Sequence, residues 1–299
     1  MKKIIFVCCL ILSVASVAAA KIKVVTTTQD LAALAREVGG EFVDVESLTR
    51  GDQDPHYIEP KPSYAMRLNR ADLVIEVGLD LEIGWLPVLL LQARNPKLAL
   101  GSLGLLDASE GLPILEVPTG KIDRSQGDIH PLGNPHYWLN PNNGIIVAQH
   151  IAQRLAELDP SHAANFQQNA EGFAARLKTE IKKWESELAP FKGRKVVIYH
   201  KSFSYFAAWS GLTVAAMIEP KPGIPPSPAY LVSLIDLMGR DRIAVILTEN
   251  FYDPKPSASL AAKTGAKLLL LPTSVQGEPA VRTYDDLFQT IVTRLTEAR

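Results

Sequence analysis

The longest regular pattern of apolar residues in the chain lies at residues 166–188. Its apolar side chains follow one another at steps of three or four, which places them on one face of an α-helix. A helix of roughly 27 residues spans about 40 Å, which is long for a globular protein. Two interpretations fit it: a helix packed on the surface of one lobe, or a rigid connection between two lobes. The apolar stripe consists of Phe166, Ala170, Phe173, Leu177, Ile181, Trp184 and Leu188.

Short runs of apolar and β-branched residues, typical of strands, occur on both sides of this helix. Before it, they alternate with helical patterns that begin near Asp30 and Asn142. Because a second set of strands begins directly after the helix, we favour the connection between two lobes. The first set of strands is expected at residues 21–26, 42–48 and 73–77, and the second at 195–199, 212–217, 243–248 and 267–272.

This alternation of strands and helices predicts fold class α/β, with two α/β lobes that have mostly parallel sheets and are joined by a long rigid helix. We expect an N-terminal metal-binding lobe at residues 21–158, a connecting helix at 159–189 and a C-terminal metal-binding lobe at 190–299. Between residues 108 and 134 the periodicity fails, and Gly, Pro and Asp are frequent. That stretch is predicted to be a long surface loop.

Residues 1–20 have the pattern of an export signal. Lys2 and Lys3 precede an apolar stretch at residues 4–17, and three alanines follow at 18–20. The apolar stretch is shorter than the roughly 20 residues that cross a membrane. We therefore expect a signal peptide rather than a membrane anchor.

Both cysteines, Cys8 and Cys9, lie inside this signal, so the mature chain is expected to have neither a disulfide nor a thiolate ligand. Neither cysteine follows small residues at the end of the apolar stretch, where a lipoprotein signal has one. These features predict a soluble periplasmic protein. The formal net charge of −1 argues against a nucleic-acid partner.

Three of the 6 histidines lie in turns or at the end of a strand, where a fold can bring them together. His56 and His136 each directly follow a proline, which fixes the backbone before the ring, and His200 ends a strand. A ligand held in place loses less entropy when it binds a metal. Since imidazole is the commonest protein ligand for transition metals, the three rings predict a zinc-type site. Candidate acceptors for their N–H groups are Asp54, Glu59 and Asn134.

The other histidines carry weaker signals. His130 precedes His136 on the long loop, and it is either an accessory ligand or a solvated loop residue. His150 and His162 lie on or near predicted helices and belong to no motif. We interpret those two as structural or surface residues.

Three stretches of the sequence resemble the metal-binding class of ABC-transporter solute-binding proteins, the zinc and manganese receptors of cluster A-I (cluster 9). The resemblance covers essentially the whole mature chain. It implies two α/β lobes with one metal ion in the cleft between them. His56 and His136 would come from the first lobe and His200 from the second. The stretches are Asp54-Pro55-His56 with the run Gly78 to Pro87, then Asn134-Pro135-His136-Tyr137-Trp138-Leu139-Asn140-Pro141, and His200 with Phe203 and Tyr205.

The resemblance also implies a fourth, acidic ligand, often Asp, from a late loop of the second lobe. This chain departs from that pattern, because residues 271–277 contain no Asp. Glu278 is the nearest acid in the loop and is our choice of fourth metal ligand. Glu249, at the end of a neighbouring strand, and a water or open position are the alternatives. Three neutral imidazoles favour Zn²⁺, whereas more oxygen ligands would favour Mn²⁺.

The function that the resemblance implies is that of a periplasmic solute-binding protein, expected to be a monomer and not an enzyme. It would deliver its ion, with zinc preferred over manganese, to an inner-membrane ABC permease. The alternative is a secreted zinc-dependent hydrolase, since three histidines and a water also form catalytic zinc sites. Against it, the chain contains neither His-Glu-x-x-His nor Gly-x-Ser-x-Gly. A third hypothesis is an adhesin with structural zinc.

Overall fold

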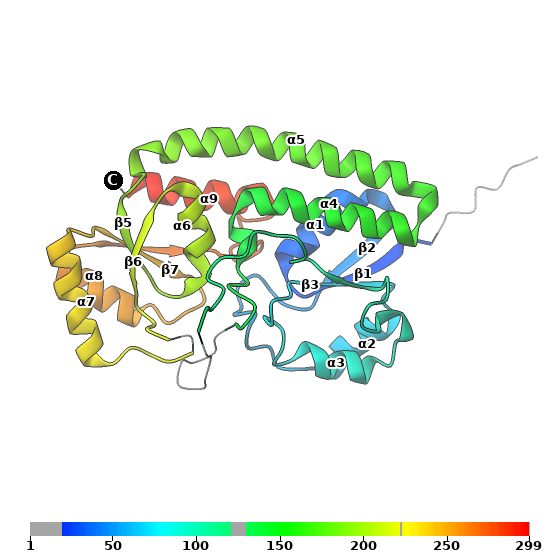
Figure 1. The fold of residues 1–299 in the computed structure, drawn as a ribbon, viewed down its shortest axis with the longest axis horizontal. Coiled ribbons are helices and arrows are strands. Elements are labelled where there is room, and N and C mark those ends of the chain that lie inside the picture. The colour runs from blue at the N-terminus through cyan, green and yellow to red at the C-terminus, as the bar shows by residue number, and fades with distance from the viewer. Residues whose placement is uncertain (1–19, 121–129, 222, 299) are drawn as a thin grey trace, which may run out of the picture.

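The computed structural model describes residues 20–120, 130–221 and 223–298, which form two α/β lobes side by side (Figure 1). The expected export signal at residues 1–20 lies, apart from Ala20, outside the described residues. Each lobe has a 4-stranded sheet in which all pairs are parallel, ordered β2-β1-β3-β4 in the first lobe and β6-β5-β7-β8 in the second. The predicted fold class is confirmed. The strands are β1 (Ile22–Thr26), β2 (Val43–Ser47), β3 (Leu73–Glu76), β4 (Leu105–Asp107), β5 (Lys195–Ile198), β6 (Thr213–Met217), β7 (Val245–Glu249) and β8 (Lys267–Leu271).

Helices cover both faces of each sheet, which is why the central strands are almost continuously buried. In the first lobe one apolar core lies under α2 and α3, and the other under α1 and α4. In the second lobe α7 and α8 cover one face, and α6 and α9 the other. The helices are α1 (Gln29–Gly39), α2 (Pro62–Arg70), α3 (Leu86–Ala93), α4 (Pro141–Leu158), α6 (Ser204–Ser210), α7 (Pro228–Asp241), α8 (Lys255–Thr264) and α9 (Tyr284–Glu297).

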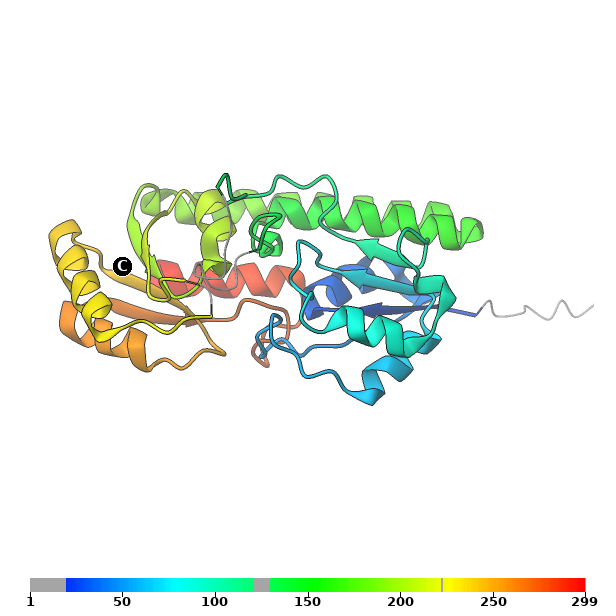
Figure 2. The ribbon, with the colours of Figure 1, turned by 60° about the horizontal axis from the view of Figure 1, so that its bottom comes forward.

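The long helix is α5 (Ala163–Leu188), which runs along one side of both lobes (Figures 1 and 2). All apolar residues of the predicted stripe, from Phe166 to Leu188, are buried. They belong to one apolar core to which strands and helices of both lobes contribute. The interpretation of this helix as a connection between the lobes is therefore confirmed. A short 3₁₀ helix, Pro160–His162, directly precedes it.

A second connection between the lobes is the loop that follows β8. The Asp30 carboxylate in α1 accepts hydrogen bonds from the Val275 N–H (2.9 Å) and from the Ser274 hydroxyl (2.5 Å). The Trp138 indole N–H donates to the Thr273 carbonyl, at 2.8 Å. Burial raises the pKa of Asp30 to about 7, although both hydrogen bonds lower it. These hydrogen bonds hold the loop after β8 against the first lobe.

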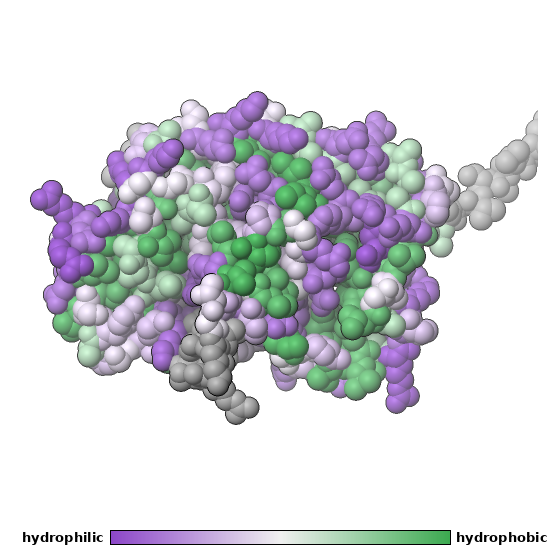
Figure 3. Space-filling model, in the orientation of Figure 1, coloured by the Kyte–Doolittle hydropathy of each residue, from purple (hydrophilic) through white to green (hydrophobic). Residues whose placement is uncertain are grey.

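The described parts of residues 108–134 contain no helix or strand, which confirms the predicted loop for those parts. Figure 3 shows apolar residues gathered in the middle of one face, between the lobes. Two half-exposed apolar side chains of the loop are Val117 and Leu132. Within the described ranges, no helix is both long and apolar enough to cross a membrane.

Candidate metal centre

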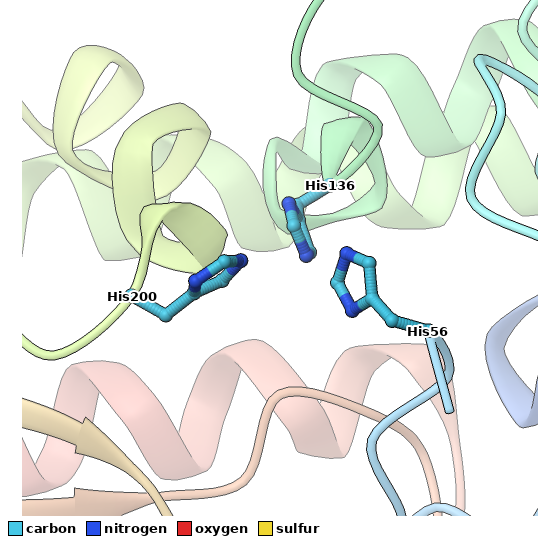
Figure 4. Close-up of side chains that lie close together, drawn as sticks. All are labelled: His56, His136 and His200. Atoms are coloured by element: carbon cyan, nitrogen blue, oxygen red, sulfur yellow. The ribbon is translucent and has the colours of Figure 1, made fainter. Parts of the chain in front are cut away.

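His56, His136 and His200 lie together where the two lobes meet (Figure 4). Each offers one ring nitrogen, and these nitrogens lie within 4.8 Å of one another. The ring centroids are 5.1 Å apart for His56 and His136, 5.5 Å for His56 and His200, and 5.3 Å for His136 and His200. The structure therefore brings together the three histidines that the sequence singled out.

The rings of His56 and His136 are held by the same pattern of hydrogen bonds within an Asx-Pro-His motif. In Asp54-Pro55-His56, the Asp54 Oδ1 atom accepts from the His56 backbone N–H (3.0 Å) and bonds the His56 Nδ1 atom (2.7 Å). In Asn134-Pro135-His136, the Asn134 Oδ1 atom accepts from the His136 N–H (2.9 Å) and bonds its Nδ1 atom (2.8 Å). Asp54 and Asn134 thus take the acceptor role that the sequence predicted for them. Glu59 does not, and its exposed side chain lines a neighbouring cavity.

His200 is held by a residue that the sequence analysis missed. It directly follows β5, and its Nδ1 atom lies 2.5 Å from Glu219 Oε2. The other carboxylate oxygen of Glu219 accepts from the Gly223 N–H at 3.0 Å. Glu219 comes shortly after β6, the strand beside β5, so it lies at the carboxyl edge of the sheet, where ligands of α/β proteins bind. The place of Glu219 shortly after a predicted strand was the sequence feature from which it could have been predicted.

The three oxygen partners decide which ring nitrogen faces the shared space. A carboxylate or amide oxygen accepts only, so each Nδ1 atom carries the proton and donates it. The Nε2 atom of each ring then holds a lone pair, which is the form that binds a metal. Burial lowers the pKa of His136 well below its ordinary value, and the neighbouring His56 and His200 lower it further. His136 is therefore neutral and ready to ligate.

Replacing Glu219 by alanine is expected to weaken metal binding about 10-fold to 100-fold, because the His200 ring loses the acceptor that fixes its orientation. Glu219→Gln is the matched control, since its amide oxygen can still accept the Nδ1–H proton, and it should lose less. Competition with a chromophoric chelator measures both affinities. Equal affinities for wild type and Glu219→Ala would contradict the role of Glu219 in orienting His200.

The structure does not bring Glu278, the predicted fourth ligand, into the histidine group. Its two carboxylate oxygens bond the guanidinium of Arg294 in α9, at 2.7 and 2.5 Å. Among the described residues, the group whose ligand atoms lie close enough for one ion contains only the three histidines. The physical reason is the packing of α9, which places an Arg with two parallel N–H groups against the Glu278 carboxylate.

Glu249, the alternative carboxylate, ends β7 and is fully buried. Burial raises its pKa to about 8, and the Ser202 hydroxyl lowers it only in part. The negative charges of Asp54 and Glu219 raise it further. Glu249 is therefore mostly protonated at neutral pH and, like Glu278, lies outside the histidine group.

Glu249→Gln and Glu278→Gln are each expected to keep metal affinity within about 3-fold of wild type, since the loss of a metal ligand or its orienting partner costs about 10-fold or more. Anaerobic titration of both variants beside wild type measures this. A loss above 10-fold in one of them would identify that carboxylate as the fourth ligand.

The comparison with known proteins decides the family. The profile of the family described as "Zinc-uptake complex component A periplasmic" matches residues 24–298. The chain belongs to this family. Its members are substrate-binding proteins of ABC transporters, which deliver metal to a membrane permease and are not enzymes. The hydrolase hypothesis therefore finds no support.

Relatives of this chain differ in the metal that their names give. The iron-binding protein YfeA of Yersinia pestis is 28% identical over 92% of this chain and 85% of its own length. The manganese ABC transporter substrate-binding lipoprotein PsaA of Streptococcus mitis is 26% identical over 82% of this chain and 77% of its own. The crystal structure of ZnuA superimposes with a TM-score of 0.77 at 26% identity, covering 93% of this chain and 99% of that one.

Proposed function

We propose that this chain is a periplasmic zinc receptor that takes Zn²⁺ between His56, His136 and His200 and hands it to an inner-membrane ABC permease. The single observation that supports the site is the set of three oxygen partners at the Nδ1 atoms, which turns three Nε2 lone pairs toward one space. This arrangement suits a metal that enters as cargo, because the ligands are in place before the ion arrives.

The chemistry of the ligands favours zinc over manganese and iron. Three neutral imidazoles suit Zn²⁺, whereas Mn²⁺ prefers carboxylates, carbonyls and water. Within the described residues, no carboxylate joins the group. Asp54 and Glu219 bond the Nδ1 atoms of the rings, which face away from the proposed metal position. They orient the imidazoles and do not provide the oxygen ligands that Mn²⁺ prefers.

The cellular setting follows from the remaining sequence features. The lysines, apolar stretch and alanines of residues 1–20 support export to the periplasm and removal of that segment. We propose that the mature protein acts as a monomer with lobes at residues 21–158 and 190–299, joined through the helix at 159–189. An ion bound between two lobes of one chain requires no second copy.

Metal analysis of cells tests the proposed cargo better than binding in vitro, since affinity order alone places Zn²⁺ above Mn²⁺ and Fe²⁺ at nearly any nitrogen site. Cells that lack this chain, grown at limiting metal, should contain less zinc and unchanged manganese and iron. Wild-type protein should restore the zinc content, and His136→Ala should not. A selective fall in manganese or iron would contradict the assignment of zinc.

A further inference from the structure

Asp54, which orients the His56 ring, also makes a hydrogen bond across the boundary between the lobes. Its Oδ1 atom bonds the His56 Nδ1 atom at 2.7 Å, and its Oδ2 atom accepts from the Tyr252 hydroxyl at 3.1 Å. Asp54 belongs to the first lobe and Tyr252 to the second, 198 positions later in the sequence. A phenol keeps its proton at neutral pH and a carboxylate accepts only, so the direction of this bond is fixed. One carboxylate therefore connects a ring of the metal centre to the opposite lobe.

The Tyr252 ring is held in the second lobe on several sides. It lies in the turn after β7, where its backbone N–H donates to the Glu249 carbonyl at 3.3 Å. The ring stacks on that of Tyr199, with centroids 4.7 Å apart, and packs against the apolar core under α7 and α8. Its centroid lies 6.1 Å from that of His200, the residue directly after Tyr199. The hydroxyl is thus presented to Asp54 from a ring that the second lobe holds in place.

Asn134, which orients the His136 ring, is bonded to the second lobe in a similar way. Its Oδ1 atom bonds the His136 Nδ1 atom at 2.8 Å, and its Nδ2 atom donates to the Lys201 carbonyl at 3.0 Å. The chemistry of each orienting side chain matches its partner, because a carboxylate oxygen accepts and an amide nitrogen donates. Asp54 meets a hydroxyl across the boundary and Asn134 meets a carbonyl, which gives a reason for the acid in one motif and the amide in the other.

His200 is oriented differently, because its partner belongs to its own lobe. Glu219 bonds the His200 Nδ1 atom with one carboxylate oxygen and accepts from the Gly223 N–H with the other. Both bonds lie within the second lobe. The rings of the first lobe, in contrast, are oriented by side chains that also bond the opposite lobe.

We propose that the Tyr252 hydroxyl is a positioning group for the metal centre, which fixes Asp54, and through it the His56 ring, only while the lobes are in contact. This inference rests on the proposed function. A carboxylate bonded at both oxygens cannot turn without breaking one bond, so the His56 Nε2 lone pair stays directed at the ion. When the lobes separate, Asp54 loses this restraint and zinc faces a less organised ligand. Tyr252 thereby makes the retention of zinc depend on contact between the lobes.

Tyr252→Phe tests this role, because it removes the hydroxyl and keeps the stacked ring. Its affinity for zinc should fall about 3-fold to 10-fold, the net effect of one typical hydrogen bond, and zinc should dissociate faster by a similar factor. Tyr230→Phe is the matched control, since it removes a hydroxyl that donates to the Met217 carbonyl at 2.7 Å within the second lobe. It should bind zinc as wild type does. Competition with a chromophoric chelator measures the affinities, and transfer of zinc to excess chelator measures the rates.

The ring N–H protons of the histidines distinguish positioning from a general loosening of the fold. In NMR spectra of the zinc-loaded proteins, the His56 Nδ1–H proton should exchange faster with solvent in Tyr252→Phe than in wild type, and that of His200 should be unchanged. Equal zinc affinities for wild type, Tyr252→Phe and Tyr230→Phe would overturn the role of Tyr252. Equally faster exchange at all three ligand rings would also overturn it, by assigning the hydroxyl to the stability of the fold.

Failure of the proposed function would look different from failure of this inference. Zinc binding would then be absent in wild type or unchanged in His136→Ala, whatever the behaviour of Tyr252→Phe. Thermal unfolding of the metal-free variants provides the last comparison. Tyr252→Phe and Tyr230→Phe each lose one hydrogen bond, so their melting temperatures should be similar.

Discussion

Replacing His136 by alanine is expected to weaken zinc binding by more than about 100-fold, a larger loss than removal of an orienting partner causes. His136 is 2% exposed, which makes it the most deeply buried of the three ligands, and its Nδ1 atom is fixed by Asn134. Burial keeps it neutral by lowering its pKa, so no proton competes with the metal near neutral pH. The water that replaces the ring cannot restore a nitrogen ligand.

Thermal stability supplies a second measurement of the same loss. Zinc at about 1,000 times its dissociation constant should stabilise wild type by about 4 kcal/mol, since it binds only the folded chain. After a 100-fold loss of affinity the same zinc concentration is only about 10 times the dissociation constant, so it should stabilise His136→Ala by no more than about 1.4 kcal/mol. His150→Ala is the control and should respond to zinc as wild type does. A full zinc response in His136→Ala would show that the ion binds elsewhere.

The second large effect is expected at Trp184, in the last turns of the connecting helix. Trp184→Ala should lower the free energy of unfolding by about 3–5 kcal/mol, as for other buried aromatic residues. The indole is 1% exposed, stacks on Phe288 in α9 with ring centroids 5.5 Å apart, and donates to the Gln289 side chain at 3.1 Å. Its loss opens a cavity in the core that both lobes share.

Chemical denaturation of the metal-free proteins measures this change. Lys182→Ala, at an exposed position of the same helix, is the matched control and should stay within about 0.5 kcal/mol of wild type. The shared core predicts one cooperative transition for wild type, because neither lobe buries its face of α5 alone. Two separate transitions, with only one of them shifted by Trp184→Ala, would contradict a rigid connection.

The parts of the fold that the sequence predicted are those with strong local patterns. The stripe from Phe166 to Leu188 lies on one helical face, and an amphipathic pattern of this kind predicts that this face is buried, as it is. The three-residue strand β4 was missed because it is too short to show a period. The helices of the second lobe, such as α7 and α8, were not anticipated, since their boundaries depend on packing against the sheet.

In the candidate site, too, the residues that could be predicted belong to short sequence motifs, and those that could not depend on contacts between distant parts of the chain. His56 and His136 could be found because Asx-Pro-His is a short sequence motif. Its three consecutive residues supply the hydrogen-bond acceptor, the rigid turn and the ring. Glu219 was missed, because it meets His200 only through the tertiary fold. For His130 the sequence left two interpretations open, because its contact with His56 also depends on the tertiary fold. Glu278 was chosen for its place in the loop, but its pairing with Arg294 depends on where α9 packs.

Anomalous diffraction from crystals of the zinc-loaded protein, recorded on both sides of the zinc edge, tests the central claim most directly. The account predicts one strong peak per chain, about 2.0–2.1 Å from the Nε2 atoms of His56, His136 and His200. A peak bound through Nδ1 atoms, at Glu249 or Glu278 without the histidines, or at a site within one lobe would contradict it.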